Sequence, residues 1–155
     1  MAWRGEALQG LLAQHQRVAM VYGVPHGAWH HVGLDTKIDK VLGISAGSMN
    51  MANTVYAQPE EPGESGPNYK RFLPGLGLTD IQICPHYQKV RDYMVDGLRL
   101  FEDITYPDSM GRTFYALPDG SYIYQDEKST LLCGEGYRFQ NGILTQLTKS
   151  EEIYD

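Results

Sequence analysis

The sequence contains little cysteine, little positive charge and no long hydrophobic run. Its two cysteines, Cys84 and Cys133, stand far apart without Cys-x-x-Cys spacing, which gives no support to a zinc ribbon or a dithiol redox motif. The 13 Lys and Arg are outnumbered by 19 Asp and Glu, and a net charge of −6 does not supply the positive field that binding to nucleic acid or anionic membranes usually requires. No stretch approaches the roughly 18 consecutive apolar residues of a membrane span. We therefore expect neither nucleic acid nor a membrane among the partners.

The remaining composition is that of a globular protein. Of the 155 residues, 42% are hydrophobic and 21% are charged, a balance that supports a buried core and argues against extended disorder. This length fits a single domain over residues 1–155. The start, MAWRGEALQGLL, lacks the succession of charged, apolar and small residues of a secretory signal, so we expect a cytoplasmic protein with reduced cysteines.

Hydrophobic patterns in the first part of the chain predict alternating helices and strands. Residues 6–15 carry an approximate helical stripe, and the valine-rich segment 17–24 predicts a buried strand. The apolar run 40–44 is typical of a central parallel strand, and residues 46–57 predict a helix directly after it. The chain between the two strands is short for the usual crossover helix, so we expect the first strand to pair unusually or with another chain.

The second part of the chain predicts one more strand and helix, followed by a meander. Residues 58–70 are rich in proline, glycine and glutamate, which predicts an exposed acidic loop, with a lid over a site as the alternative. An alternating segment predicts a strand that ends at Pro85, and residues 88–101 show helical spacing. From Thr113 onward, short strands separated by tight turns predict an antiparallel arrangement.

Three histidines offer the one metal-binding alternative. His26 and His30 would share a face of a helix, with His31 beside them, but Pro25 and Gly27 break a helix there and no acidic or cysteine ligand lies at a supporting spacing. We therefore expect surface or loop histidines, no metal and no cofactor.

The pattern Gly43-x-Ser45-x-Gly47 lies between the strand at 40–44 and the helix that follows it. In this context it is typical of a nucleophile elbow, where a serine stands on a sharp strand-to-helix turn. The helix start would add partial positive charge, and the Ala46 N–H could donate to a developing oxyanion. A turn that merely uses small residues is the alternative.

A nucleophilic serine needs a base and an acid that orients the base. His86 is the best candidate base because it follows a predicted strand end, as Ser45 does, although a structural histidine capping a loop would look the same. Asp119 lies in the turn sequence Pro118-Asp119-Gly120, where it could orient the histidine or simply form the turn. Spacing leaves Glu60 open as another acid.

Three segments taken together resemble the peptidase E family of serine peptidases, to which the cyanophycinases are related. They are GISAGSMNMA, ICPHY and FYALPDGSYIY, and the resemblance covers about residues 33–147. The family's GxSAG elbow, its Pro-His pair after a strand and its LP(E/D)G turn are matched at Ser45, His86 and Asp119. The resemblance implies an α/β three-layer core with a mostly parallel sheet, like that of class I glutamine amidotransferases, plus C-terminal antiparallel strands.

The resemblance also implies a reaction. The expected activity is hydrolysis of a small peptide after an amino-terminal or isopeptide-linked aspartate, with Ser45 as nucleophile, His86 as base, Asp119 orienting His86 and Ala46 N–H as one oxyanion donor. An aspartyl substrate needs a cation for its side chain, and Arg91 is the tentative choice. An ordinary exposed helix arginine is the alternative.

The amino-terminal part departs from the family. Only residues 1–39 precede the strand at Lys40, and they contain no Gly-Gly-Asn loop of the kind that supplies the second oxyanion donor in the family. Three explanations compete: a truncated, catalytically impaired member acting as a structural or interaction protein, a minimal member completed by a homodimer, and a working hydrolase in which Gly23 or Gly27 supplies the donor.

Overall fold

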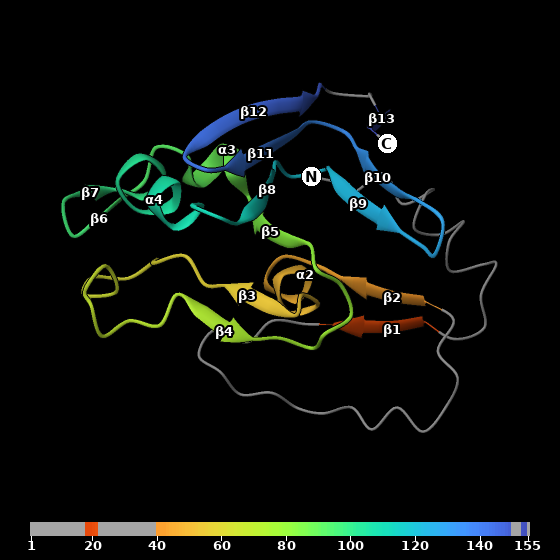
Figure 1. The fold of residues 1–155 in the computed structure, drawn as a ribbon, viewed down its shortest axis with the longest axis horizontal. Helices are drawn as coiled ribbons and strands as arrows, with labels where there is room; N and C mark the ends of the chain where they lie inside the picture. Colours follow the sequence, from red (N-terminus) through yellow and green to blue (C-terminus); the bar gives the residue numbers. More distant parts are fainter. Residues whose placement is uncertain (1–17, 22–39, 150–152, 155) are drawn as a thin grey trace.

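The computed structural model describes residues 18–21, 40–149 and 153–154, and within them the fold is α/β with small sheets and short helices (Figure 1). The helix expected at 6–15, the histidines at 26, 30 and 31, and the glycines at 23 and 27 lie outside these residues. None of the helices within them is long and apolar enough to cross a membrane.

The two front strands form a parallel pair. β1 (Val18–Val21) lies beside β2 (Lys40–Gly43) in the register Val18 opposite Lys40. The expectation of an unusual pairing, or of pairing with another chain, was therefore wrong. Residues 22–39 lie between the strands, and a parallel connection needs only about a dozen residues.

The helix expected over 46–57 is shorter than predicted. α2 (Ala46–Asn50) ends early, and β3 (Thr54–Tyr56) follows, antiparallel to β4 (Phe72–Pro74). The run Thr-Val-Tyr favours a strand because β-branched and aromatic side chains pack well on a pleated surface. Residues 58–70 connect β3 to β4 without helix or strand, as the loop prediction required.

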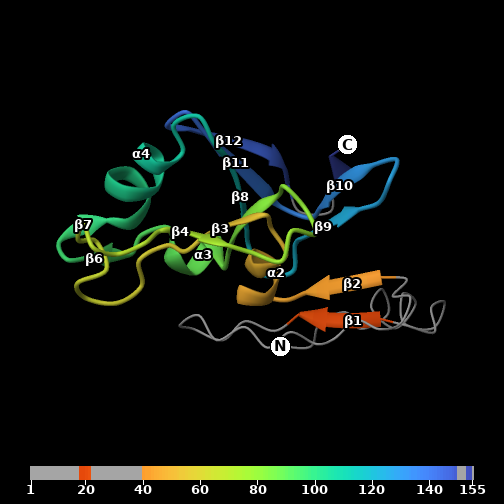
Figure 2. The same cartoon turned by 60° about the horizontal axis from the view of Figure 1, so that its bottom comes forward.

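The largest sheet in the described part of the chain, here called the central sheet, is mixed and has the strand order β12–β11–β8–β5. β5 (Gln82–Pro85) runs parallel to β8 (Thr113–Leu117), and β11 (Gly136–Gln140) and β12 (Ile143–Thr148) complete it in antiparallel fashion. α2 packs between β5 and the β1–β2 pair (Figures 1 and 2).

The helix predicted over 88–101 was wrong. α3 (Tyr87–Val90) is a single turn, after which the chain forms the hairpin of β6 (Met94–Val95) and β7 (Leu98–Arg99). Asp96 and Gly97 both have positive φ, 52° and 80°, as the tight turn of a two-residue hairpin requires. A wide helical turn, η1 (Leu100–Thr105), and α4 (Tyr106–Asp108) lead back to β8.

The strands from Thr113 onward pair with one another in antiparallel fashion, as predicted, but they do not form a meander, because β8 pairs with β11 and with the parallel β5 instead of with the next strand. β9 (Tyr122–Gln125) and β10 (Thr130–Cys133) form a hairpin to which β13 (Ile153–Tyr154) adds a third strand. A three-layer core with a mostly parallel sheet does not emerge from the described residues. Among their strand pairs only β1–β2 and β5–β8 are parallel, and their helices are too short to form layers.

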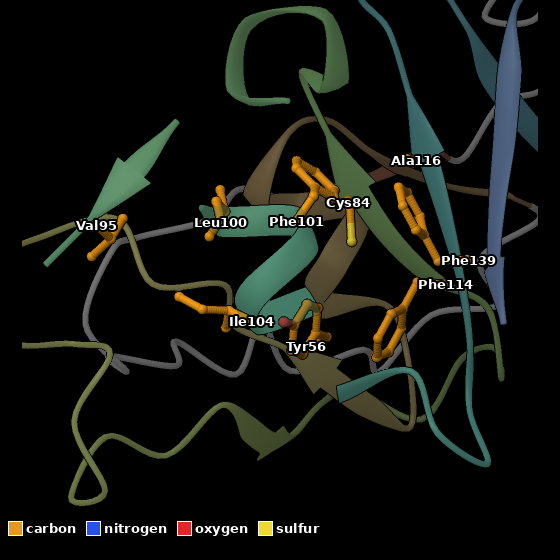
Figure 3. Packing of buried hydrophobic residues seen from close by; sticks show 9 residues of the cluster. All are labelled: Tyr56, Cys84, Val95, Leu100, Phe101, Ile104, Phe114, Ala116 and Phe139. Carbon is orange, nitrogen blue, oxygen red and sulfur yellow. The ribbon is translucent and has the colours of Figure 1, made fainter. Parts of the chain in front are cut away.

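The core lies between the central sheet, β3 and η1 (Figure 3). The rings of Tyr56 and Phe114 stack with centroids 4.3 Å apart, and Phe101 stacks on Phe139 at 5.1 Å. Cys84 is fully buried among them, where it packs as a small hydrophobic residue. The core thereby fixes β5 and β8, the two strands whose carboxyl ends carry His86 and Asp119.

Candidate active site

Ser45 stands on a strained turn at the end of β2. Its backbone angles, φ 52° and ψ −124°, lie outside the regions that L-residues favour, and its side chain is exposed. Gly43 makes this turn possible: a Cβ there would lie 2.5 Å from the Met51 sulfur and 2.7 Å from the Ser48 Cα. The first glycine of the motif therefore lets α2 fold back closely on β2, and the serine is left at the apex.

The turn also places backbone donors beside the serine. Ala46 is the first residue of α2, so its N–H has no acceptor within the helix. Ser48 lies one turn further on, and its hydroxyl donates to the Ser45 carbonyl at 2.5 Å. The Ser48 hydroxyl therefore bonds to the backbone, whereas the Ser45 hydroxyl contacts His86.

His86 follows β5 immediately and adopts a left-handed conformation, φ 59° and ψ 29°, as the residue that precedes α3. Its Nε2 lies 2.8 Å from Ser45 Oγ. The tautomer with its proton on Nδ1 leaves Nε2 free to accept the hydrogen of the serine hydroxyl. The base predicted from sequence is therefore within proton-transfer distance of the predicted nucleophile.

Asp119 lies in the turn after β8, and the sheet register explains why it meets His86. Pro85 of β5 is opposite Leu117 of the parallel β8, so the residues after each strand emerge at the same edge. Asp119 Oδ1 lies 2.5 Å from His86 Nδ1. Glu60, the alternative acid, instead lies in the 58–70 loop, where its N–H donates to Glu64.

Two further residues of α3 contact Asp119, and sequence reasoning missed both. Lys89 Nζ lies 2.6 Å from Asp119 Oδ2, and Gln88 Oε1 accepts the Asp119 N–H at 3.0 Å. The hydrogen bond from Lys89, followed by that from His86, lowers the pKa of Asp119 below its usual range. The sequence signal that could have indicated Gln88 and Lys89 is their position in the first turn after the candidate base His86.

Arg91 is not joined to this constellation. Its Nε donates to Asp92 at 3.2 Å, its side chain is exposed, and within the described part of the chain no hydrogen bond or ion pair links it to Ser45, His86 or Asp119. It directly follows the last residue of α3 and lies five residues after His86, about 1.4 helical turns along the chain.

Neither cysteine supplies a nucleophile at the elbow. Both thiols are free, and burial raises the pKa of Cys84 to about 12, so this thiol stays protonated at neutral pH. Over residues 40–149, His, Cys, Asp and Glu side chains do not gather in groups of three that could hold a metal ion. Ser45, His86 and Asp119 bring a hydroxyl, an imidazole and a carboxylate together.

Ser45 thus stands on a strained strand-to-helix turn of an α/β fold, with an imidazole on its Oγ and a carboxylate on the far ring nitrogen. The model of peptidase family S51 matches residues 27–132, which is more than half of the chain. The chain belongs to this family, and the resemblance to the peptidase E family drawn from the sequence motifs is confirmed. No curated protein matches the sequence closely enough to serve as a relative.

Proposed function

We propose that the protein is a serine peptidase that cleaves its substrate through an acyl-enzyme formed on Ser45. The observation that carries this proposal is the continuous path from Ser45 Oγ to His86 Nε2, at 2.8 Å, and from His86 Nδ1 to Asp119 Oδ1, at 2.5 Å. Family membership supports a peptidase, and the elbow supplies the residue types that acyl transfer needs.

The proposed reaction begins when Ser45 Oγ attacks the scissile carbonyl carbon and its proton moves to His86 Nε2. The carbonyl oxygen becomes an oxyanion that accepts a hydrogen bond from the Ala46 N–H. His86 then gives the proton to the leaving amine as the C–N bond breaks, which leaves Ser45 acylated. Water, deprotonated by His86, hydrolyses the ester and returns the serine.

Asp119 has an orienting role in this proposal. As an ionised carboxylate it accepts a hydrogen bond from the His86 Nδ1–H, fixes the tautomer that exposes Nε2 and stabilises the imidazolium formed during attack. A second oxyanion donor, for which Gly23 and Gly27 are the candidates, falls outside the described residues. Loss of one such donor costs about 100- to 1,000-fold in turnover, so this donor decides how active the site is.

We propose small peptides with an amino-terminal or isopeptide-linked aspartate as the substrates. Arg91 is the proposed receptor for the aspartate side chain, because an arginine binds a carboxylate through two parallel hydrogen bonds. To do so it would exchange its exposed partner Asp92 for the substrate, which is feasible because exposed ion pairs contribute only about 0.2 to 1 kcal/mol.

The test is hydrolysis of paired dipeptides that differ only at the first residue, aspartate against asparagine. We expect cleavage of the aspartyl peptide, loss of cleavage in Ser45→Ala, and a raised KM without a matching fall in kcat in Arg91→Ala. Lys70→Ala, which removes another exposed cation, is the matched control. Equal cleavage by Ser45→Ala and wild type would overturn the mechanism, whereas equal cleavage of both dipeptides would overturn the substrate assignment alone.

A further inference from the structure

Asp119 is held at three points, all by residues at the start of α3. His86 lies on Oδ1, Lys89 lies on Oδ2 at 2.6 Å, and Gln88 accepts the backbone N–H. The turn after β8 is thereby fastened to the turn after β5. The proposed mechanism uses only the first of these contacts.

The carboxylate needs additional holding because it is poorly protected from solvent. Side-chain exposure is 42% for Asp119 and 40% for His86, so water can compete for both carboxylate oxygens. A carboxylate attached by Oδ1 alone can rotate about its terminal bond and exchange its oxygens. The Lys89 ammonium occupies Oδ2 and leaves one oxygen for the imidazole.

We infer that Lys89 is a positioning residue for the proposed reaction: with Gln88 it holds Asp119 ionised and in a single orientation toward His86. This inference rests on the proposed function, because it concerns the orienting acid of the same site. Lys89 acts through Asp119 and does not touch the reacting atoms. The downward shift in the pKa of Asp119, to which the hydrogen bond from Lys89 is the largest contribution, is in keeping with this role.

The ammonium also changes how the site responds to protonation. Among the described residues, His86 and Lys89 are the charged or titratable groups that face the Asp119 carboxylate. Lys89 balances the negative charge of the Asp119 carboxylate in part, which favours its ionised form. Removing Lys89 should therefore make the Asp119 carboxylate easier to protonate and leave its Oδ2 without this partner.

The experiment compares wild type, Lys89→Met, Lys89→Arg and the control Lys70→Met. The measured quantity is the second-order rate of Ser45 labelling by a fluorophosphonate probe between about pH 5 and pH 8, where histidine titrates. We expect Lys89→Met to label about two- to fivefold more slowly near neutral pH, which corresponds to the contribution of an exposed ion pair. Lys89→Arg should restore the wild-type profile, and Lys70→Met should match it.

A second readout does not depend on catalysis. In a Ser45→Ala background, the carboxyl carbon resonance of Asp119 should titrate at higher pH in Lys89→Met than with Lys89 in place, because the charged partner is gone. If the wild type is labelled and Lys89→Met is labelled at the same rate, the role of Lys89 is overturned and the proposed function stands. The same conclusion follows if the Asp119 resonance titrates at the same pH with and without Lys89. A folded but unlabelled wild type overturns the proposed function.

Discussion

At the scale of single residues, the site depends on Ser45 occupying a conformation that costs energy. A non-glycine residue in such a region carries about 1 to 3 kcal/mol of strain, which surrounding packing must offset. The sequence predicted that Ser45 stands on a sharp turn, because glycines at 43 and 47 indicate a turn too tight for larger side chains. The position of Lys89 one turn after the candidate base was visible in the sequence, but its partner Asp119 was not, because their interaction depends on the register of β5 against β8.

The strain at Ser45 gives a stability prediction. Ser45→Gly should unfold with a free energy about 1 kcal/mol higher than Ser45→Ala, because glycine adopts φ 52° without steric cost while alanine retains the strain. The two variants remove the same hydroxyl, so each serves as the control of the other. Urea denaturation measures the difference, and equal or lower stability of the glycine variant would mean that the turn is relaxed.

Gly43 gives a prediction about both packing and chemistry. In Gly43→Ala the new methyl would approach the Ser48 Cα to 2.7 Å, so α2 must shift away from β2. We expect a loss of about 1 to 3 kcal/mol in the free energy of unfolding, as for overpacked sites, together with slower labelling of Ser45. Gly63→Ala is a control for the labelling rate alone, because a Cβ there meets nothing within 4 Å while its positive φ makes the variant strained. Gly43→Ala labelled at the wild-type rate would contradict the tight elbow.

At the scale of elements, Asp96 connects the β6–β7 hairpin to the 58–70 loop. Its carboxylate accepts hydrogen bonds from the N–H of Gly63 at 2.9 Å and from the N–H and hydroxyl of Ser65. The sequence could have indicated the hairpin from Asp96-Gly97, a strong hairpin signal, but the helical spacing of apolar residues around it favoured a helix. The chain forms a hairpin instead of a helix here, since two residues in a row adopt the positive φ that a tight hairpin turn requires.

This connection predicts the behaviour of the loop. Asp96→Ala should make the 58–70 loop more susceptible to a protease that cleaves after glutamate, because Glu60, Glu61 and Glu64 lie within it. Asp92→Ala removes a nearby exposed carboxylate that does not contact the loop, and it should leave proteolysis unchanged. Equal cleavage in wild type and Asp96→Ala would show that the carboxylate does not hold the loop.

Acid should release the loop in the same way. The hydrogen bonds from Ser65, then Gly63, lower the pKa of Asp96, so its contribution to holding the loop is complete above the usual aspartate pKa, about 3.9. It is lost as pH falls through the lowered pKa of the folded state. The hydrogen-exchange rates of the Gly63 and Ser65 amides, relative to their intrinsic rates, should therefore rise only below the usual aspartate pKa. Protection lost at higher pH would contradict this account.

At the scale of the whole molecule, three strands bring the site together. β2, β5 and β8 each end at a site residue or just before one, and α2 packs against both β2 and β5 (Figure 1). The order of motifs, the elbow and the C-terminal strands could be predicted from local patterns. The mixed sheets could not, because strand direction depends on pairings between distant segments rather than on local periodicity.

The parallel pairing of β1 with β2 within one chain yields a prediction about assembly. Because the front strand comes from the same chain as Ser45, the site should form without a partner copy. The rate of Ser45 labelling per chain should then be independent of protein concentration over a range of about 100-fold, wide enough to shift a monomer–dimer equilibrium. A rate that rises with concentration, alongside a doubled mass in solution, would favour the homodimer.

The central claim is that Ser45, His86 and Asp119 form a working nucleophile, base and orienting acid. The most direct test is fluorophosphonate labelling of folded protein, with the modified residue located by peptide mapping. The account predicts a label on Ser45 in wild type, none in Ser45→Ala, and a rate reduced by about 100-fold or more in His86→Ala, the contribution expected of a general base. A folded wild type that takes no label at Ser45, or a His86→Ala variant labelled at the wild-type rate, would contradict it.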